Sequence, residues 1–580
     1  MARLDPHSYA DADHAQTGRI ELKLRVDFGA RTLRGACALH FRAPGAGPLD
    51  LDTRGLSIEA VTDLAGAPLP YQLHAPEPVL GARLRVELPP GTAGLRVLYQ
   101  TSPEASALQW LDPAQTAGGV HPFLFSQCQP IHARSLVPLQ DTPRVRITAR
   151  ASFTVPSQLR TLMGAAALGR EPAGPGESTD AFEMPQAIPP YLLAFAVGDL
   201  TPRQLSVRSA VWAERSLADA AAWEFERIEE ILLAAEELFG PYDWDRFDVL
   251  VMPPSFPYGG MENPRLTFVT PSLLAGDRSL VNVIAHELAH AWTGNLVTNA
   301  SANDFWLNEG FTVYAERRIL EATEGREAAE LHASIGRHDL GVALARFADR
   351  PQLTRLRNDL QGVDPDDAFS TVPYEKGYLL LRRLEELAGR ARWDSFLARY
   401  LAKFRFQSIT TQDFLDLLDA QLPGLSQQAR ALEWIDQPGL PADAPEPDSQ
   451  RLRELSQLAG RVEVPLGPMT PTEILVYLQA LPVLTAAQCE ELDRRFGLAA
   501  RKSLELRHTF VLAQLRAGAP GAVEGARRVL AETGRMKYLR PLFGELFRRE
   551  PALAREIYQQ QRGGYHPIAR AAIEGLLRTA

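Results

Sequence analysis

Alternation of apolar and polar residues along the first two hundred positions predicts β structure. In residues 21–26 every second side chain is apolar, which is typical of a strand with one buried face and one face in water. Further runs rich in Val, Leu, Phe and Thr cover 83–88, 95–100 and 144–155, and Pro- and Gly-rich clusters at 43–48 and 89–91 separate such runs. We therefore expect an N-terminal β-sandwich or saddle domain over residues 1–200.

The spacing of apolar positions changes near residue 216. Residues 220–238 follow a helical period, and helical segments continue to about residue 422, interrupted by short strands predicted at 247–252 and 266–269. This pattern predicts a mostly helical domain of α/β character over residues 201–435. A Pro-rich stretch at 436–448 predicts a linker, and amphipathic helices beyond it predict an all-α, solenoid-like domain over residues 449–580. The expected fold class is multidomain α+β.

Composition and charge exclude several classes of partner. The 580 residues carry a net charge of −10, which provides no cationic surface for nucleic acid or anionic lipid. No run of about 18 or more uncharged apolar residues predicts a membrane span, and the first residues lack the apolar core of a signal peptide. Three scattered cysteines (Cys37, Cys128 and Cys489) are typical of a reducing compartment. We expect a soluble, cytoplasmic protein.

The strongest chemical signal is the sequence HELAH at residues 286–290, inside a segment predicted to be helical from about 279 to 294. His286 and His290, at i and i+4, lie on one face, so two imidazoles can bind one Zn²⁺ at about 2.0–2.1 Å. Glu287 lies about 100° round the helix, where it can reach the attacking water without being a ligand. The pattern therefore predicts a zinc hydrolase.

A catalytic zinc site needs a third protein ligand and one open position. Glu309 follows His290 after eighteen intervening residues, on a second predicted helix that runs to about residue 321, and is the natural third ligand. The alternative is a coincidental His pair on a solvated helix face. The five-residue pattern arises by chance in roughly two chains of this composition per hundred, and a Glu at this position lowers those odds at least tenfold further.

Longer motifs then point to a family. These are FSQCQPIH (125–132), PYGGMENP (257–264), WTGNLVTN (292–299), VPYEKG (372–377) and GRMK (534–537). With the zinc motif, they resemble the gluzincin aminopeptidases of the aminopeptidase N type, and most closely the leukotriene A(4) hydrolase and aminopeptidase B branch. The resemblance covers nearly the whole chain. It implies a thermolysin-like catalytic domain, one Zn²⁺ per chain, and short peptides with a free N-terminus as substrates.

The resemblance also implies roles for individual residues. Glu262 would bind the free α-amino group of the peptide, on an edge strand that includes Gly259, Gly260 and Met261. Without the resemblance, a hairpin turn with an exposed carboxylate is the favoured reading of this segment. Tyr374 would donate a hydrogen bond to the oxyanion, where a Tyr is otherwise more often a packing residue. The remaining substrate-binding residues that the resemblance implies are Gln127, Gln129, Tyr258, Asp366, Arg535 and Lys537.

Three of these residues have a plain structural alternative. Asp366 matches an acidic residue at the far end of the substrate pocket, but it also belongs to the acidic run 364–367, which reads as a solvated loop. Arg535 and Lys537 match a pair that binds a terminal carboxylate in the leukotriene A(4) hydrolase branch, and this end wall would favour tripeptides. Two such cations are otherwise an ordinary wet surface.

One position departs from the family pattern. Phe369 stands where leukotriene A(4) hydrolase carries a second Tyr, five residues before the tyrosine at 374. The loss of that hydroxyl counts against conversion of lipid epoxides. We therefore expect an aminopeptidase, with a bifunctional epoxide hydrolase as the first alternative and a non-catalytic scaffold as the second. We also expect a monomer.

Overall fold

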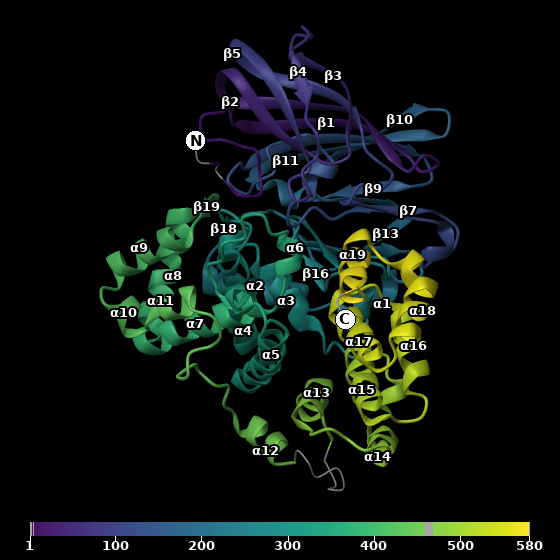
Figure 1. Cartoon of the computed structure of the whole chain (residues 1–580), viewed down its shortest axis with the longest axis vertical. Helices are drawn as coiled ribbons and strands as arrows, with labels where there is room; N and C mark the ends of the chain where they lie inside the picture. The colour runs from purple at the N-terminus through teal and green to yellow at the C-terminus, as the bar shows by residue number, and fades with distance from the viewer. Residues whose placement is uncertain (1–2, 4, 459–467, 579–580) are drawn as a thin grey trace.

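The β structure predicted for the first 200 residues forms two sheets in the computed structural model, which describes residues 3, 5–458 and 468–578 (Figure 1). The larger sheet runs in the order β10 (Ala166–Gly174), β11 (Glu177–Ile188), β8 (Ile147–Pro156), β1 (Thr17–Asp27), β2 (Thr32–Thr53), β5 (Ala82–Gln100) and β3 (Ser57–Asp63), with β4 (Tyr71–Leu73) paired to β5. The smaller sheet runs β6 (Leu108–Leu111), β7 (Phe123–Ser126), β12 (Phe195–Gly198) and β9 (Arg160–Met163). The predicted N-terminal β domain is confirmed.

Two Pro- and Gly-rich clusters that predict breaks between strands lie inside strands instead. Strand β2 continues through residues 43–48 and β5 through residues 89–91. Their pairing shifts register between His40 and Gly45 and again between Gly45 and Gly47. Such bulges accommodate prolines that have no N–H to donate. Residues 83–88 and 95–100 therefore belong to one strand, and the prediction of two was wrong.

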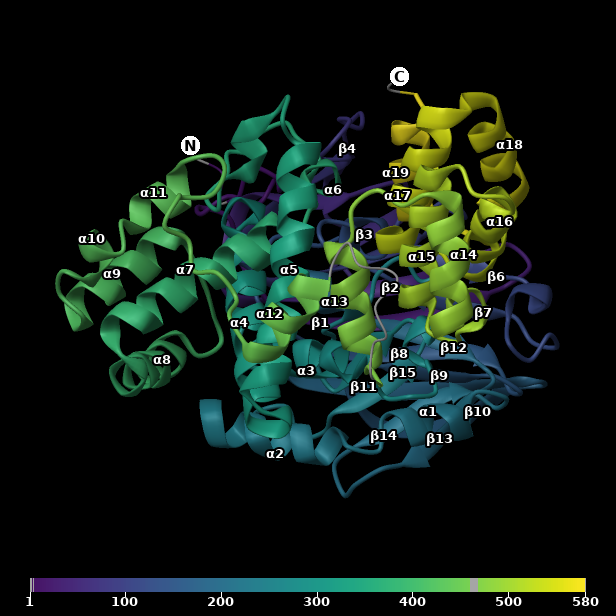
Figure 2. The same ribbon diagram turned by 90° about the horizontal axis from the view of Figure 1, so that it is seen from below.

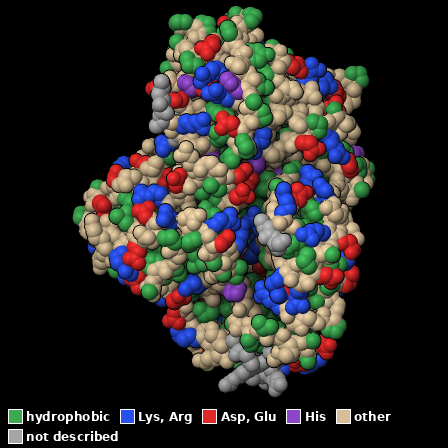
Figure 3. All heavy atoms as spheres, viewed as in Figure 1, with side chains coloured by type: hydrophobic (Ala, Val, Ile, Leu, Met, Phe, Trp, Pro, Cys, Tyr) green, Lys and Arg blue, Asp and Glu red, His purple; other side chains and the backbone are tan. Residues whose placement is uncertain are grey.

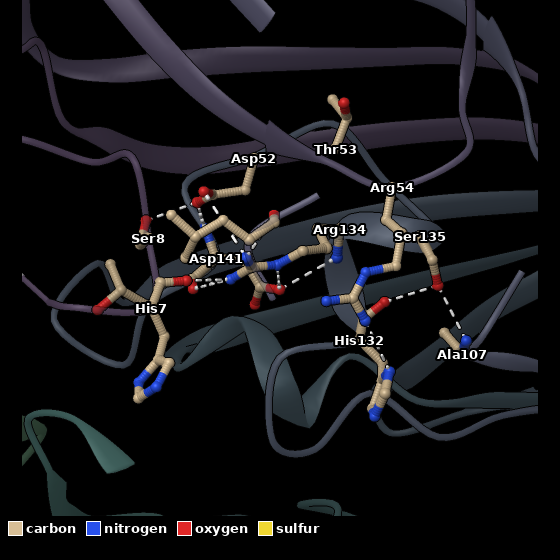
Figure 4. A network of polar contacts seen from close by, with 12 residues as sticks. His7, Ser8, Asp52, Thr53, Arg54, Ala107, His132, Arg134, Ser135 and Asp141 are labelled. Carbon is tan, nitrogen blue, oxygen red and sulfur yellow. Dashed lines mark hydrogen bonds and ion pairs between the residues drawn. The ribbon is translucent and has the colours of Figure 1, made fainter. Parts of the chain in front are cut away.

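A buried polar network anchors the loop that leaves β7 toward the rest of the molecule (Figure 4). The side chain of Arg134, in the 3₁₀ turn Ala133–Ser135, is fully buried and donates from Nε to Asp141 Oδ2 at 2.9 Å. It also donates to the carbonyls of Leu80 and His7. Because a buried guanidinium needs such partners, they fix the loop, in which Gln129 and His132 come shortly before Arg134.

The central domain contains a mixed five-stranded sheet in the order β13 (Leu200–Gln204), β14 (Ala210–Glu214), β15 (Asp248–Val251), β17 (Leu266–Val269) and β16 (Gly260–Met261), so that β16 is an edge strand. Its helices are α1 (Ala218–Glu224), α2 (Ile228–Phe239), α3 (Val281–Ala289), α4 (Trp306–Glu324), α5 (Arg326–Arg346), α6 (Pro365–Ala368), α7 (Val372–Ala388), α8 (Arg390–Phe404), α9 (Thr411–Gln421), α10 (Leu425–Gln428) and α11 (Ala431–Asp436). A short strand pair joins β18 (Val297–Asn299) to β19 (Gln407–Ile409).

Two predicted helices differ from those observed. The segment 220–238 is divided into α1 and α2, because the chain turns at Phe225 and buries that ring in the core. The helix of the zinc motif is α3, which ends at Ala289 with His290 as its C-cap, several residues before the predicted end. Gly294, with φ +130°, lies in the turn that follows, and an added Cβ there would lie 2.5 Å from the His290 ring.

The C-terminal domain is helical in all of its described secondary structure, as predicted. It comprises α12 (Gln450–Leu458), α13 (Pro471–Ala480), α14 (Ala486–Phe496), α15 (Leu504–Ala517), α16 (Ala522–Glu532), α17 (Met536–Arg549), α18 (Pro551–Gln561) and α19 (Pro567–Leu576). Figure 2 shows these helices beside the central domain, and the surface is hollowed where the two meet, with Lys and Arg side chains along the hollow (Figure 3). In the described part of the chain, no helix combines the length and apolar character needed to cross a membrane.

Tyr258 connects the central and C-terminal domains. Its ring packs against both the apolar core that the first two domains share and the core of helices α15 to α19. Two backbone hydrogen bonds reinforce the junction: the Gly534 N–H donates to the Pro254 carbonyl and the Met536 N–H to the Pro257 carbonyl, at 2.6 and 2.8 Å. The start of α17 is therefore fixed against the loop that leads into β16.

Candidate metal centre and substrate site

Three ligand-type side chains converge between helices α3 and α4. The two Nε2 atoms of His286 and His290 face each other at 3.2 Å, and Glu309 Oε2 lies 3.5 Å from each of them. A tetrahedral ion with bonds of about 2.0–2.1 Å places its ligand atoms about 3.3 Å apart, so these spacings suit zinc. The structure therefore brings together the three residues that the sequence nominated as metal ligands.

The polar atoms of this cluster that lack hydrogen-bond partners also indicate a cation site. Glu309 is 2% exposed, yet its Oε2 has no hydrogen-bond partner. Two imidazole nitrogens in contact satisfy each other only by sharing one proton, whereas both are good ligands when neutral. Burial alone would raise the pKa of Glu309, but the two imidazoles lower it to about 2, so the carboxylate is ionised.

Partners outside the triad fix the orientation of both imidazoles. Glu316 Oε2 accepts from His286 Nδ1 at 3.0 Å, and the Thr293 carbonyl and Thr312 hydroxyl lie 3.1 Å from His290 Nδ1. These contacts leave Nε2 of each ring for the metal. The sequence analysis missed Glu316, although it lies seven residues after Glu309 and so on the same face of α4.

Glu287 lies beside the triad but is directed toward strand β16. Its side chain is buried, and burial raises the pKa of the carboxyl to about 7 against the lowering effect of the two imidazoles. A Cβ added to Gly260 would lie 2.2 Å from Glu287 Oε1 and 2.5 Å from its Cγ. The absence of a side chain at Gly260 thus leaves room for the Glu287 carboxylate.

Glu262, the residue after β16, is also buried rather than exposed in a hairpin turn, at 4% exposure. Its Oε1 accepts from Gln129 Nε2 at 3.1 Å, and Asn295 Nδ2 donates to its backbone carbonyl at 2.7 Å. Carboxylate oxygens of Glu262 and Glu287 and a ring nitrogen of His290 lie within 4.8 Å of one another. Gln127 does not reach the carboxylate, since its amide contacts Met261 Sδ.

An aromatic group lines the opposite side of the centre. The Tyr374 ring, in the first turn of α7, lies parallel to the His286 ring with centroids 6.1 Å apart. Burial, followed by the Glu309 carboxylate, raises the pKa of Tyr374 well above its ordinary value, so the hydroxyl keeps its proton. Phe369 lies between Tyr374 and Tyr258, at 6.2 and 5.8 Å from their ring centroids, so this side is apolar where a second Tyr hydroxyl would be polar.

Asp366 lies in the short helix α6 and not in a solvated loop. Its Oδ2 and His132 Nε2 are 2.9 Å apart, and the Ser106 hydroxyl lies 2.8 Å from the other ring nitrogen. The side chain of Asp366 is one quarter exposed. Asp366 thus connects the central domain to the anchored loop of the N-terminal domain, a contact between residues 234 positions apart that the sequence did not predict.

Arg535 and Lys537 lie at the start of α17, in different surroundings. Arg535 is 8% exposed, and a Cβ added to Gly259 would lie 2.6 Å from its Nη2, so this glycine makes room for the guanidinium. The Lys537 side chain is exposed, and its Nζ forms an ion pair with Glu505 at 2.8 Å. Arg535 is therefore not an ordinary wet-surface cation, whereas Lys537 is an exposed cation with an acidic partner.

Comparison with known proteins identifies each part of the chain. Family models match residues 6–192 (Peptidase M1 N-terminal domain), 223–434 (Peptidase family M1 domain) and 469–577 (Leukotriene A4 hydrolase, C-terminal). The chain is 37% identical to Leukotriene A-4 hydrolase of Xenopus laevis over 98% of both chains, and 36% identical to Leucine aminopeptidase 2 of Pyricularia oryzae over 99% of this chain and 98% of that one. A structure of yeast LTA4 hydrolase in complex with bestatin superimposes with a TM-score of 0.92 at 32% identity, covering 99% of this chain and 97% of the other.

Fold, site and comparisons together define a zinc metallo-aminopeptidase, so the predictions of an enzyme and of its fold class are confirmed. The chain belongs to peptidase family M1, in the group that carries the C-terminal domain of leukotriene A4 hydrolase. Zinc is the metal of this family. The domain boundaries at residues 200, 435 and 448 stay predictions.

Proposed function

We propose that this protein removes single N-terminal residues from short peptides, with tripeptides favoured, and that one Zn²⁺ per chain is held by His286, His290 and Glu309. The observation that carries the proposal is the position of Glu262 beside Glu287 and His290. In any amino acid the α-nitrogen lies only about 2.5 Å from its own carbonyl carbon. An ammonium bound by Glu262 therefore leaves room for one residue before the bond under attack.

Each side chain has a separate task in this proposal. Glu287 accepts the proton of the attacking water and delivers it to the leaving amine. Tyr374 donates a hydrogen bond to the oxygen on which negative charge develops. When bound, zinc polarises the scissile carbonyl and lowers the pKa of water to about 7. Gln129 holds Glu262 in place, and Tyr258, Gly259, Gly260 and Met261 shape the wall along the peptide.

The test is a panel of aminoacyl-anilides assayed on zinc-loaded enzyme, beside the same compounds N-acetylated. We expect turnover of the free amines and very little of the blocked compounds, because an acetylated nitrogen carries no charge for Glu262 to bind. Efficient cleavage of N-acetylated substrates would refute the exopeptidase assignment. Zinc content, measured on the same samples, checks the ratio of one ion per chain.

Preference for tripeptides rests on the cationic wall at the start of α17. A carboxylate at one fixed distance from the centre is favoured there, and longer chains must pass the wall. Arg535→Ala should raise KM for tripeptides and leave the KM of aminoacyl-anilides, which lack that carboxylate, nearly unchanged. Equal losses on both substrate types would show that the residue has only a structural role.

Epoxide hydrolysis is the second candidate function, favoured by the similarity to leukotriene A-4 hydrolase. Asp366 is a carboxylate that could direct water to a distant carbon of a bound lipid. Against it, Phe369 replaces the expected hydroxyl with an apolar ring between Tyr258 and Tyr374. We therefore propose weak or absent conversion of allylic fatty-acid epoxides, and a direct assay of dihydroxy-acid formation tests this.

A cytoplasmic location and a monomeric state belong to the same proposal. All three cysteines are buried free thiols, which is consistent with a reducing compartment. Short peptides are the only partners that the site requires. Sedimentation analysis of the zinc-loaded enzyme tests the monomeric state.

A further inference from the structure

Arg535 is an unusual cation because it is buried without a carboxylate in contact. Its Nη1 donates to the Tyr538 hydroxyl at 3.1 Å, its guanidinium carbon lies 5.1 Å from the centre of the Tyr538 ring, and its Nε has no partner. No ion pair of Arg535 occurs among the described residues. A buried guanidinium with free N–H groups is costly unless an anion completes it.

The nearest carboxylate, Glu505 on α15, is reached only through Tyr538. Tyr538 accepts from Arg535 and donates its own proton to Glu505 Oε2 at 2.8 Å. The other carboxylate oxygen of Glu505 takes the ammonium of Lys537. Burial alone would raise the pKa of Glu505, but Lys537 and Arg535 lower it to about 2, so the carboxylate is charged.

The arrangement separates the two cations of the end wall. Glu505 compensates Lys537 directly, whereas one hydroxyl stands between Glu505 and Arg535. Arg535 therefore has no carboxylate in direct contact among the described residues, and its Nη2 is held over Gly259, next to the edge strand β16. Backbone bonds from Gly534 and Met536 to the loop before Gly259 prevent the start of α17 from moving away.

We propose that Tyr538 and Glu505 are positioning residues that hold the Arg535 guanidinium ready for the C-terminal carboxylate of a short peptide, and so set the preference for peptide acids over peptide amides. This inference rests on the proposed function. Tyr538 holds the guanidinium at Nη1, while Nη2 lies over Gly259 beside the edge strand. Glu505 orients the Tyr538 hydroxyl by accepting its hydrogen bond, and it forms an ion pair with Lys537.

The experiment compares three substrates: a tripeptide, the same tripeptide as its C-terminal amide, and an aminoacyl-anilide. Tyr538→Phe should raise KM for the tripeptide acid by about tenfold, as expected for one lost hydrogen bond to a charged group, with kcat nearly unchanged. KM for the amide and for the anilide should stay within about twofold of the wild-type values. The acid-over-amide preference should therefore fall by about tenfold.

Tyr565→Phe is the matched control. Tyr565 is a buried tyrosine of the same helical core, and its hydroxyl donates to the Leu530 carbonyl at 2.8 Å, away from Arg535. It should leave the acid-over-amide ratio unchanged while costing similar stability. In an Arg535→Gln background, Tyr538→Phe should have no further effect on that ratio, because Tyr538 acts through Arg535.

If the wild-type enzyme is active, two results would overturn the inference. One is an unchanged acid-over-amide ratio in Tyr538→Phe; the other is an equal loss on all three substrates, which indicates a general structural role. If the wild-type enzyme, loaded with zinc, hydrolyses no aminoacyl-anilide, the proposed function itself fails and this inference fails with it.

Discussion

A single added methyl group at Gly260 tests how closely the base and the substrate strand are fitted to each other. In Gly260→Ala the new Cβ would lie 2.2 Å from Glu287 Oε1, 2.4 Å from its Cδ and 2.5 Å from its Cγ. Non-bonded carbon and oxygen atoms need about 3.2 Å or more, so roughly 1 Å of room is missing. Because three atoms of Glu287 are involved and the side chain is buried, rotating only its end does not relieve the clash.

Either Glu287 or strand β16 must therefore move by about 1 Å, and a displacement of that size at a reacting group costs about a hundredfold in rate. A hundredfold loss corresponds to about 2.7 kcal/mol in the activation free energy. We expect kcat on an aminoacyl-anilide to fall about a hundredfold. Zinc content should be unchanged, since the motion does not involve His286, His290 or Glu309.

Gly341→Ala provides the control, because Gly341 lies in α5 with open space around its Cα. Alanine is favoured over glycine inside a helix by roughly 0.5–1 kcal/mol, so this variant should be fully active and slightly more stable. The measurements are kcat, KM, zinc content and the thermal midpoint of each variant. A Gly260→Ala enzyme whose kcat stays within about threefold of wild type would show that Glu287 and β16 are not closely fitted.

Further predictions concern the metal and the substrate amine. Glu287→Gln should lower kcat by about 10²–10⁴-fold while zinc stays bound; metal loss with the fold intact would show that Glu287 is a ligand. Glu316→Ala should weaken zinc binding by about 10–100-fold in competition with a chelator, because His286 loses its orienting acceptor, and unchanged affinity would contradict that role. Glu262→Ala should cost several kcal/mol in kcat/KM on free-amine substrates, measured against N-acetylated ones; equal losses on both would count against amine binding. Phe369→Tyr should add epoxide-hydrolysing activity if a missing hydroxyl limits it, and no change would point to another cause.

The sequence predicted those parts of the site that depend on local spacing. The i, i+4 spacing of His286 and His290 forces both rings to one face of a helix, whatever the rest of the chain does. Glu309 could be predicted as a ligand because it follows His290 at a short distance in sequence, on the next predicted helix. The order of a β domain, a mixed domain and a helical domain was likewise predictable, since the period of apolar positions changes near residue 216 and a Pro-rich stretch at 436–448 precedes the last helices.

Contacts between distant segments were not predictable in this way. The bond between His132 and Asp366 joins a β-domain loop to a helix of the central domain, and the relay from Arg535 through Tyr538 to Glu505 crosses two helices of the third. Period and propensity carry no information about such pairings. For the same reason, the sequence did not show that the glycines before Glu262 make room for Arg535 and Glu287.

Helices α4 and α7 touch through bare backbone at one point. A Cβ added to Gly310 would lie 2.8 Å from the Gly377 Cα, and one added to Gly377 would lie 2.8 Å from the Gly310 Cα. Glu309 is the neighbour of one glycine, and Tyr374 lies three residues before the other. The distance between Glu309 and Tyr374 is thus set by the contact of two main chains. Replacing Gly310 or Gly377 by a larger residue can only increase that distance. We therefore expect differences in substrate range among related enzymes to arise at the outer walls of the site, in the β7 loop and at the start of α17. The spacing between Glu309 and Tyr374 stays the same.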